Sequence, residues 1–185
     1  MKIIKHASIK VSNWSGGTTS ELYIYPENSN YKDLDFKFRL SKATIEVEQS
    51  IFTPLPNVKR KLMLLDGELE LIHKHQHSKK LKPLEFDSFS GSWNTKSIGK
   101  ATDFNLMMLG NTEGDFKVFS TQKPRSIIFN QSSGVSVFYV AKGSINLLNS
   151  EVNSGELIIF DEPTNQPIQI NFSENSDIIS IKITL

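Results

Sequence analysis

Apolar and polar residues alternate with a period of two along most of this chain, and this alternation constrains its fold more than any other feature. The segment 39–48 alternates in this way, and so do the segments 168–173 and 179–185. Successive side chains of a strand point to opposite faces, so these segments predict half-buried β-strands. No long segment has the i, i+3, i+4, i+7 spacing of an amphipathic helix. Helix is therefore expected only as short pieces in connections.

Turn-forming sequences separate the predicted strands. They are Asp66-Gly67, Asn111 to Gly114, Ser132-Ser133-Gly134, Lys142-Gly143, Asn153-Ser154-Gly155 and Asp161-Glu162-Pro163. Many short strands joined by such turns are typical of a β-sandwich or β-barrel, whereas parallel βαβ units need long helical segments between strands. The sequence predicts an all-β fold with little helix.

The two halves of the chain are weakly similar to each other. The segment 65–71 (LDGELEL) is similar to the segment 141–147 (AKGSINL), and each is followed by a segment that ends in Phe-Asp, at 86–87 and at 160–161. Two related barrels in one chain leave such a pattern. The alternative is coincidence between glycine turns, which are common in hairpins.

Composition excludes several classes of function. The net charge of +1 provides no long-range field that would attract nucleic acid or an anionic membrane, so neither is an expected partner. The chain has no cysteine, which excludes disulfides, thiolate nucleophiles and iron–sulfur clusters. No segment has the apolar length of a signal core or a membrane span, so we expect a cytoplasmic protein.

Three of the four histidines, His73, His75 and His77, alternate within five residues. On one face of a strand, imidazoles with this spacing can bind zinc, copper or nickel. The run continues into Ser78-Lys79-Lys80, however, and no carboxylate is placed to orient the rings. This context favours the exposed tip of a hairpin. We therefore predict no metal site and no cofactor, with metal binding by these histidines as the alternative.

Two arginines stand where the alternation calls for apolar side chains. Arg39 begins the face that carries Ala43 and Ile45, and Arg60 has the same parity as Leu62. Both guanidinium groups should therefore point inward, towards a barrel mouth. Their forked donors suit a carboxylate or phosphate ligand. The alternative is an internal ion pair whose partner is Glu21, Asp87 or Asp103.

The segment 13–22 is the second unusual stretch, because paired glycines at Gly16 and Gly17 follow Trp14 closely. Glycines let backbone amides approach a bound group, and an indole can form a flat wall beside it. The alternative interpretation is a β-bulge or loop that caps a barrel. The chain has no serine-hydrolase, phosphate-loop or dinucleotide-binding motif, so we assign no catalytic residue.

Five motifs occur in order between residues 14 and 107. They are Trp14 with Gly16-Gly17-Thr18-Thr19-x-Glu21, Phe38-Arg39-Leu40-Ser41-x-Ala43-x-Ile45-Glu46, Phe52-Thr53-x-Leu55-Pro56-Asn57-Val58-x-Arg60, Leu64-Leu65-Asp66-Gly67 and Asp103-Phe104-Asn105-Leu106-Met107. Together they resemble the HutD/Ves family. That resemblance implies a bicupin, with two cupin-like β-barrels in one chain, although the usual cupin metal motif of His-x-His, Glu and a later His is absent. We place the barrels at residues 1–120 and 121–185, and expect that the extreme N-terminal strand can pair across.

The family resemblance also implies a function. HutD-like proteins accompany histidine-degradation genes and are associated with binding a pathway intermediate such as formylglutamate or urocanate, while Ves-like proteins are associated with stress responses. Both candidate ligands are carboxylates. We therefore predict a protein that senses or sequesters a small anionic metabolite. The predicted ligand-binding residues are Arg39 and Arg60 for the anion, Ser41, Thr19 and Asn105 for neutral hydrogen bonds, Trp14 as a wall, and Glu21 to orient an arginine or meet a ligand amine.

Two other functions remain open from the sequence. The chain can instead be a cupin-type enzyme, namely an isomerase, lyase or hydrolase acting on a small carboxylate or a sugar. It can also form a homodimer through exposed apolar side chains, for which Phe36, Phe38 and Leu40 are the predicted contact residues.

Overall fold

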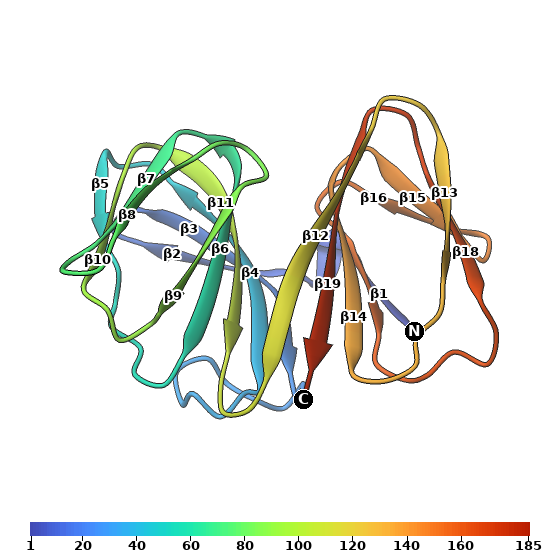
Figure 1. The fold of residues 1–185 in the computed structure, drawn as a ribbon, viewed down its shortest axis with the longest axis horizontal. Helices are drawn as coiled ribbons and strands as arrows, with labels where there is room; N and C mark the ends of the chain where they lie inside the picture. The colour runs from blue at the N-terminus through green and yellow to red at the C-terminus, as the bar shows by residue number, and fades with distance from the viewer. The chain divides into compact units, whose positions relative to one another are not determined.

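The computed structural model describes residues 1–185 and consists almost entirely of β-strands (Figure 1). The single helical element is the 3-10 turn η1 (His6–Ser8), which confirms the prediction of an all-β chain with little helix. No helix combines the length and the apolar composition that crossing a membrane requires. The strands divide into two compact units, one formed by residues 10–112 and the other by residues 1–9 and 113–185.

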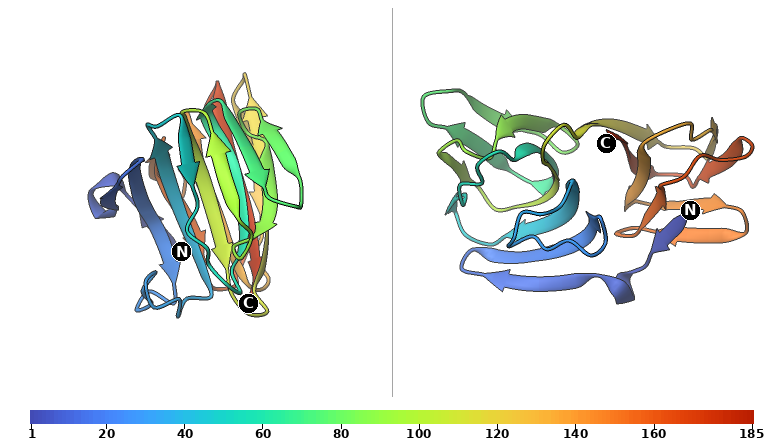
Figure 2. Two further views of the ribbon diagram at one scale, coloured as in Figure 1. Left: turned by 90° about the vertical axis from the view of Figure 1, so that its left-hand side faces the viewer. Right: turned by 90° about the horizontal axis from the view of Figure 1, so that it is seen from below.

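The unit formed by residues 10–112 contains a six-stranded and a four-stranded antiparallel sheet. In spatial order the larger sheet is β2 (Lys10–Trp14), β3 (Gly17–Tyr25), β4 (Phe38–Ile45), β11 (Ala101–Met108), β6 (Lys59–Gly67) and β9 (Phe86–Ser90). The smaller sheet is β5 (Gln49–Ile51), β10 (Thr95–Ile98), β7 (Leu69–His73) and β8 (Ser78–Leu81). The right-hand view of Figure 2 shows the blue strands of the larger sheet and the green strands of the smaller sheet on opposite sides of this unit.

The other unit contains a five-stranded and a four-stranded sheet. The larger one is β1 (Lys2–Ile4), β17 (Leu157–Phe160), β14 (Val135–Lys142), β19 (Ser176–Thr184) and β12 (Glu113–Thr121). The smaller one is β13 (Arg125–Phe129), β18 (Ile168–Phe172), β15 (Ser144–Leu147) and β16 (Ser150–Asn153). None of the four sheets is closed by hydrogen bonds between its outermost strands, so each unit is an open, two-sheet form of a barrel.

The division between the units differs from the predicted one at residue 120. Strand β12 pairs with β19 from Glu113 to Thr121, so these residues belong to the second unit. The turn that separates the units is the earlier one, where the Thr112 amide donates to the Leu109 carbonyl. The N-terminal strand β1 pairs with β17, so it does cross to the unit formed by the C-terminal half (Figure 1).

The order of the strands reveals an internal repeat. The order β4-β11-β6-β9 in one unit corresponds to β12-β19-β14-β17 in the other, and β5-β10-β7-β8 corresponds to β13-β18-β15-β16. The similar segments 65–71 and 141–147 therefore lie in equivalent hairpins. Their glycines, Gly67 and Gly143, have φ angles of +88° and +78°, a conformation that side chains with a Cβ atom rarely adopt. The repeat supports two related barrels over coincidence.

The alternation read from the sequence matches the burial of the strands. In the unit 10–112 the core lies between the two sheets and includes Leu62 and Leu64, on the same face as Arg60. In the other unit most of the apolar residues predicted to point inward are buried, namely Ile170, Phe172, Ile179, Ile181 and Ile183, whereas Ile168 is half-buried and Leu185 is exposed. Hydrophobic burial of these faces is the main driving force for such a fold.

The residues predicted to form an exposed dimer surface are buried instead. Phe36, Phe38 and Leu40 are at most 3% exposed. Phe38 stacks on Tyr25 with ring centroids 5.4 Å apart, and Phe36 joins an apolar cluster with Val58. These side chains pack inside the chain, so they are not available as contact residues of a dimer.

Candidate anion pocket and histidine cluster

A pocket of about 340 Å³ opens in the unit formed by residues 10–112. Of the seven residues predicted to bind a ligand, six line it, namely Trp14, Thr19, Arg39, Ser41, Arg60 and Asn105. The seventh, Glu21, contacts one of them through an ion pair. The structure therefore brings the predicted site residues together.

The pairing of three neighbouring strands places the two arginines on one face. Arg39 on β4 and Arg60 on β6 both lie directly opposite Met107 on the central strand β11. Adjacent strands are about 4.8 Å apart, so the two arginine Cα atoms are separated by about 10 Å. Asp103 and Asn105 project from the same face of β11, because side chains two residues apart share a face. These residues form the polar floor of the pocket.

Arg39 is held by partners on its own sheet. Its Nε atom donates to Glu21 Oε2 at 2.7 Å, and its Nη1 atom donates to Ser41 Oγ at 3.1 Å. The guanidinium carbon lies 4.3 Å from the centroid of the Tyr31 ring. Of the ion pairs that the sequence allowed, the structure therefore contains the one between Arg39 and Glu21. The side chain of Arg39 is 7% exposed, so it is ordered by these contacts rather than by solvent.

Arg60 is buried with fewer acceptors. Its Nη2 atom donates to Asn105 Oδ1 at 3.1 Å, whereas its buried Nε atom has no hydrogen-bond partner. Its guanidinium carbon lies 4.8 Å from the ring centroid of Phe52 and 5.0 Å from that of Phe89. Burial lowers the pKa of Arg60 to about 10, so the group is still a cation at neutral pH. A buried cation with an unpaired donor is costly unless an anion joins it.

Asp103 is the acidic residue that lines the pocket, and the predicted ligand set omitted it. Burial raises the pKa of its carboxyl group to about 7, against the opposing effect of the Arg60 charge. Its Oδ1 atom accepts a hydrogen bond from Asn105 Nδ2. The sequence suggested Asp103 only as one possible ion-pair partner of an arginine. Asp103 and Asn105 are two residues apart on one strand, however, and this spacing was a signal that both side chains face the same pocket.

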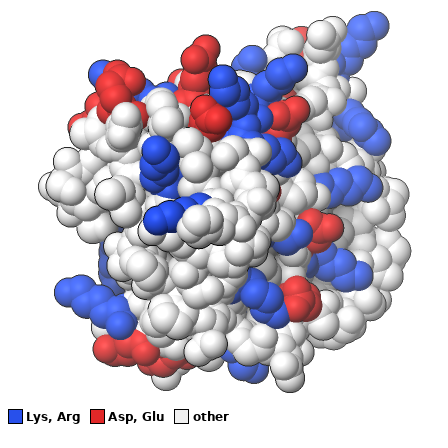
Figure 3. Space-filling view, turned by 60° about the vertical axis from the view of Figure 1, so that its left-hand side comes forward, with Lys and Arg blue, Asp and Glu red and all other residues white.

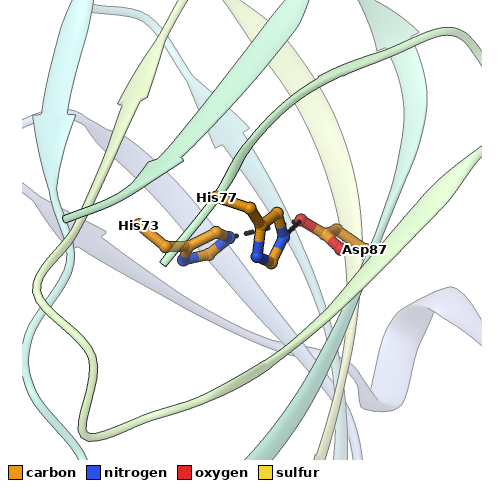
Figure 4. Close-up of side chains that lie close together, drawn as sticks. All are labelled: His73, His77 and Asp87. Atoms are coloured by element: carbon orange, nitrogen blue, oxygen red, sulfur yellow. Dashed lines mark hydrogen bonds and ion pairs between the residues drawn. The ribbon is translucent and has the colours of Figure 1, made fainter. Parts of the chain in front are cut away.

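A second polar cluster lies in the same unit and contains His73, His77 and Asp87 (Figure 4). The Nε2 atom of His77 lies 2.7 Å from Asp87 Oδ2, and the Nε2 atom of His73 lies 3.3 Å from the same oxygen. The side chain of His73 is fully buried, while that of His77 is 40% exposed. Burial lowers the pKa of His73. For Asp87, burial acts to raise the pKa, but hydrogen bonds from His77 and the Ser88 amide outweigh it and lower the pKa.

The prediction of a solvated hairpin tip is wrong for His73, which is buried, and the prediction that no carboxylate orients the rings is wrong for both His73 and His77. The His73 amide donates to the His77 carbonyl, and His75 between them has a φ of +65°. This tight turn folds the chain back, so the two rings meet with centroids 4.7 Å apart instead of lying along one strand. The carboxylate comes from Asp87 on β9, in the other sheet. His75 remains an exposed residue of the turn, as predicted.

The sequence model of the HutD family matches residues 6–179 of this chain. The chain belongs to the HutD family. This confirms the family resemblance inferred from the five motifs. None of the curated proteins matches it.

Solved structures similar to this HutD-family chain cover nearly its whole length. HutD from Pseudomonas fluorescens SBW25 superimposes with a TM-score of 0.79 at 17% identity, covering 99% of this chain and 97% of that one. The bacterial pirin YhhW from Escherichia coli, in complex with nickel(II), has a TM-score of 0.74 at 10% identity, with 98% and 97% covered. Vicilin from Corylus avellana has a TM-score of 0.65 at 8% identity, with 98% and 84% covered. These similarities, at low identity, confirm the predicted bicupin fold.

The surface charge of the HutD-family chain is mixed. On the face drawn in Figure 3, lysine and arginine side chains lie among aspartate and glutamate side chains. This distribution agrees with the net charge of +1 and offers no continuous basic track on that face.

Proposed function

We propose that this HutD-family protein binds a small carboxylate in the pocket lined by Arg39 and Arg60. One observation carries the proposal: Arg60 lies in the pocket wall as a buried cation whose Nε atom has no acceptor. A ligand carboxylate offers two oxygens to a guanidinium fork, and it also offsets the cost of burying the charge.

The other groups of the pocket restrict the kind of carboxylate. A volume of about 340 Å³ suits a metabolite rather than a larger cofactor, since ligand pockets commonly span about 300–1,000 Å³. Tyr31, Phe52 and Trp14 supply flat apolar walls, and the hydroxyls of Ser41 and Thr19 supply neutral hydrogen bonds. Formylglutamate and urocanate belong to this chemical class. Sensing or sequestering such a compound, in the cytoplasm and in connection with histidine use, is the biological role that we propose.

The test is a thermal-shift titration against histidine, urocanate, formylglutamate and related dicarboxylates. A ligand that binds only the folded protein at about 100 times its Kd stabilises it by about 2.7 kcal/mol. Arg60→Met should abolish this shift, because methionine occupies similar space without the charge. Arg125→Met is the matched control, since Arg125 is an exposed arginine on β13 in the other unit.

The proposal fails in either of two cases. No carboxylate shifts the melting temperature of the wild-type protein, or the shift is equal in the Arg60→Met protein. The variants must each melt in one cooperative transition without ligand. Replacing a buried, incompletely paired ion with an apolar side chain is often neutral or stabilising, so folding of Arg60→Met is expected.

A second candidate function is catalysis on the same carboxylate, and the pKa of Asp103 favours it. A carboxyl group with a pKa of about 7 in a pocket is suited to general acid–base catalysis at neutral pH. An isomerase, lyase or hydrolase would convert the bound compound, which NMR spectra of protein and ligand mixtures would reveal over time. In that case Asp103→Asn should retain binding and lose turnover, whereas a pure binding protein leaves the ligand spectrum unchanged.

A further inference from the structure

The cluster of His73, His77 and Asp87 is separate from the proposed anion pocket, because none of its three residues lines that pocket. One ligand atom from each residue lies within 4.8 Å of the other two. Figure 4 shows the two imidazoles and the carboxylate pointing toward one another. They come from the end of β7, the residue before β8, and β9, so the protein fold already gathers them.

We propose that His73, His77 and Asp87 bind a divalent transition-metal ion of the Zn²⁺ and Ni²⁺ class. Two imidazole nitrogens and one carboxylate oxygen are ligands that such ions accept, and a site with three protein ligands leaves a coordination position for water. The exposed edge of His77 gives the ion and that water a path from solvent.

The spacing of the ligand atoms suits a metal ion. With metal–ligand distances of about 2.0–2.2 Å, the ligand atoms of a tetrahedral site lie about 3.3–3.6 Å from one another. The distance of 3.3 Å between His73 Nε2 and Asp87 Oδ2 already has this value. The distance of 2.7 Å between His77 Nε2 and the same oxygen must increase by several tenths of an ångström. His77 lies at the edge of a turn and is partly exposed, so its ring can make this adjustment.

A residue outside the three ligands orients His73. The Nδ1 atom of His73 lies 2.8 Å from Thr95 Oγ1, and the Thr95 hydroxyl donates to the Trp93 carbonyl. Without an ion, His73 Nε2 donates to the Asp87 carboxylate. With an ion bound, Thr95 Oγ1 would accept the Nδ1 proton, which leaves the lone pair of Nε2 for the ion. Metal-binding histidines usually have such a partner on the other ring nitrogen. The rings of Phe89 and Trp93, with centroids 4.5 Å and 5.4 Å from that of His73, fix the plane of the imidazole.

The experiment uses the full chain without an affinity tag, treated with EDTA and dialysed. Calorimetric titrations with Zn²⁺ and Ni²⁺ give the stoichiometry and Kd, and Co²⁺ gives a visible spectrum that reports ligand number. We expect one equivalent to bind. His77→Ala and Asp87→Asn should each weaken binding at least about 10- to 100-fold, which is the loss commonly seen when even an outer-shell partner of a metal is removed.

His75→Ala is the matched control, because His75 is an exposed residue of the same turn and is not one of the three clustered residues. It should bind each ion with the wild-type Kd. The proposal is overturned if the wild-type protein binds no more tightly than His77→Ala, or if His75→Ala weakens binding as much as His77→Ala does. The second outcome would identify the histidine run as a nonspecific surface chelator. Thermal melts without metal test whether the variants fold. If His77→Ala does not fold, the comparison with Asp87→Asn still tests the proposal.

Discussion

Arg39 Nε donates a hydrogen bond to Glu21 Oε2 across 2.7 Å, between neighbouring strands of the six-stranded sheet. The two residues are not directly opposite each other, because Glu21 pairs with Ser41 and a β-bulge follows between Glu21 and Tyr23. The ion pair orients the guanidinium towards the pocket and at the same time offsets part of its charge. In the proposed carboxylate site, Glu21 would therefore position Arg39 and limit how strongly the pocket attracts an anion.

Replacing Glu21 with glutamine should strengthen carboxylate binding. The glutamine amide still offers an oxygen to Arg39 Nε, but the change removes a negative charge near the bound anion. Relief of a repulsion of about 1 kcal/mol lowers the Kd about fivefold. The side chain of Glu21 is 26% exposed, so the effect on stability should be small. Calorimetric titration at two salt concentrations checks the prediction, and an unchanged or higher Kd contradicts it.

Carboxylate affinity should decrease as pH rises through about 7, because the pKa of Asp103 lies there. The protonated carboxyl group is neutral, whereas the ionised one repels the ligand and competes for Arg60. The complex therefore holds more protons than the unliganded protein, and its Kd increases with pH. Titrations between pH 6 and pH 8.5 measure the slope, with Asp103→Asn as the control that should flatten it. These two pH values are about one unit below and 1.5 above that pKa.

Asp103 should also affect folding stability in a defined pH window. Its folded-state pKa of about 7 is raised above the ordinary value of 3.8, so the folded state binds the proton more tightly than the unfolded chain does. The contribution of Asp103 to the free energy of unfolding must then fall as pH rises between these two values. Asp103→Asn should remove this contribution, so its stability should fall less, or rise more, with pH than that of the wild-type protein. Denaturant melts at several pH values test it, and parallel profiles for the two proteins would contradict the assignment.

The two glycines after Trp14 should respond differently to alanine. A Cβ atom on Gly17 would lie 1.9 Å from the Thr44 carbonyl oxygen of β4, so Gly17→Ala should lower the free energy of unfolding by about 2–4 kcal/mol. The three atoms nearest to a Cβ atom on Gly16 all belong to the Trp14 ring, the first at 2.1 Å, and that ring is partly exposed and can move. Gly16→Ala should therefore keep most of the stability and weaken ligand binding by moving the indole. Equal destabilisation in denaturant melts would contradict this difference.

Thr95→Val should weaken binding of Zn²⁺ about tenfold while the apo protein stays folded. Valine has nearly the same shape as threonine but cannot accept the Nδ1 proton of His73, so the imidazole loses the partner that holds its tautomer. Ser97→Ala on the same strand is the control, because the Ser97 hydroxyl is buried and has no partner. The Kd for Zn²⁺ and the apo melting temperature separate a positioning role from a structural one. An unchanged Kd would remove Thr95 from the site.

Much of the anion pocket was predictable because side-chain parity within a strand is a local property. Alternation alone placed Arg39 with Ser41 on one face of their strand and Arg60 with Leu62 on one face of theirs, and both faces are buried. Glycines marked the hairpin turns for the same reason, because whether a residue can adopt a positive φ depends on that residue alone. The motifs spread over residues 14–107 determined the family, which the match over residues 6–179 confirms.

Contacts between distant segments were decided only by the tertiary structure. The register of β3 against β4 selected Glu21 as the partner of Arg39 over Asp87 and Asp103. Burial shifted the pKa of Asp103, and the pairing of β12 with β19 moved the boundary between the units. The turn at His75 and the approach of β9 gathered His73, His77 and Asp87. Sequence spacing determines which face of a strand a side chain occupies, but strand register, burial and turn geometry determine which other side chains it meets.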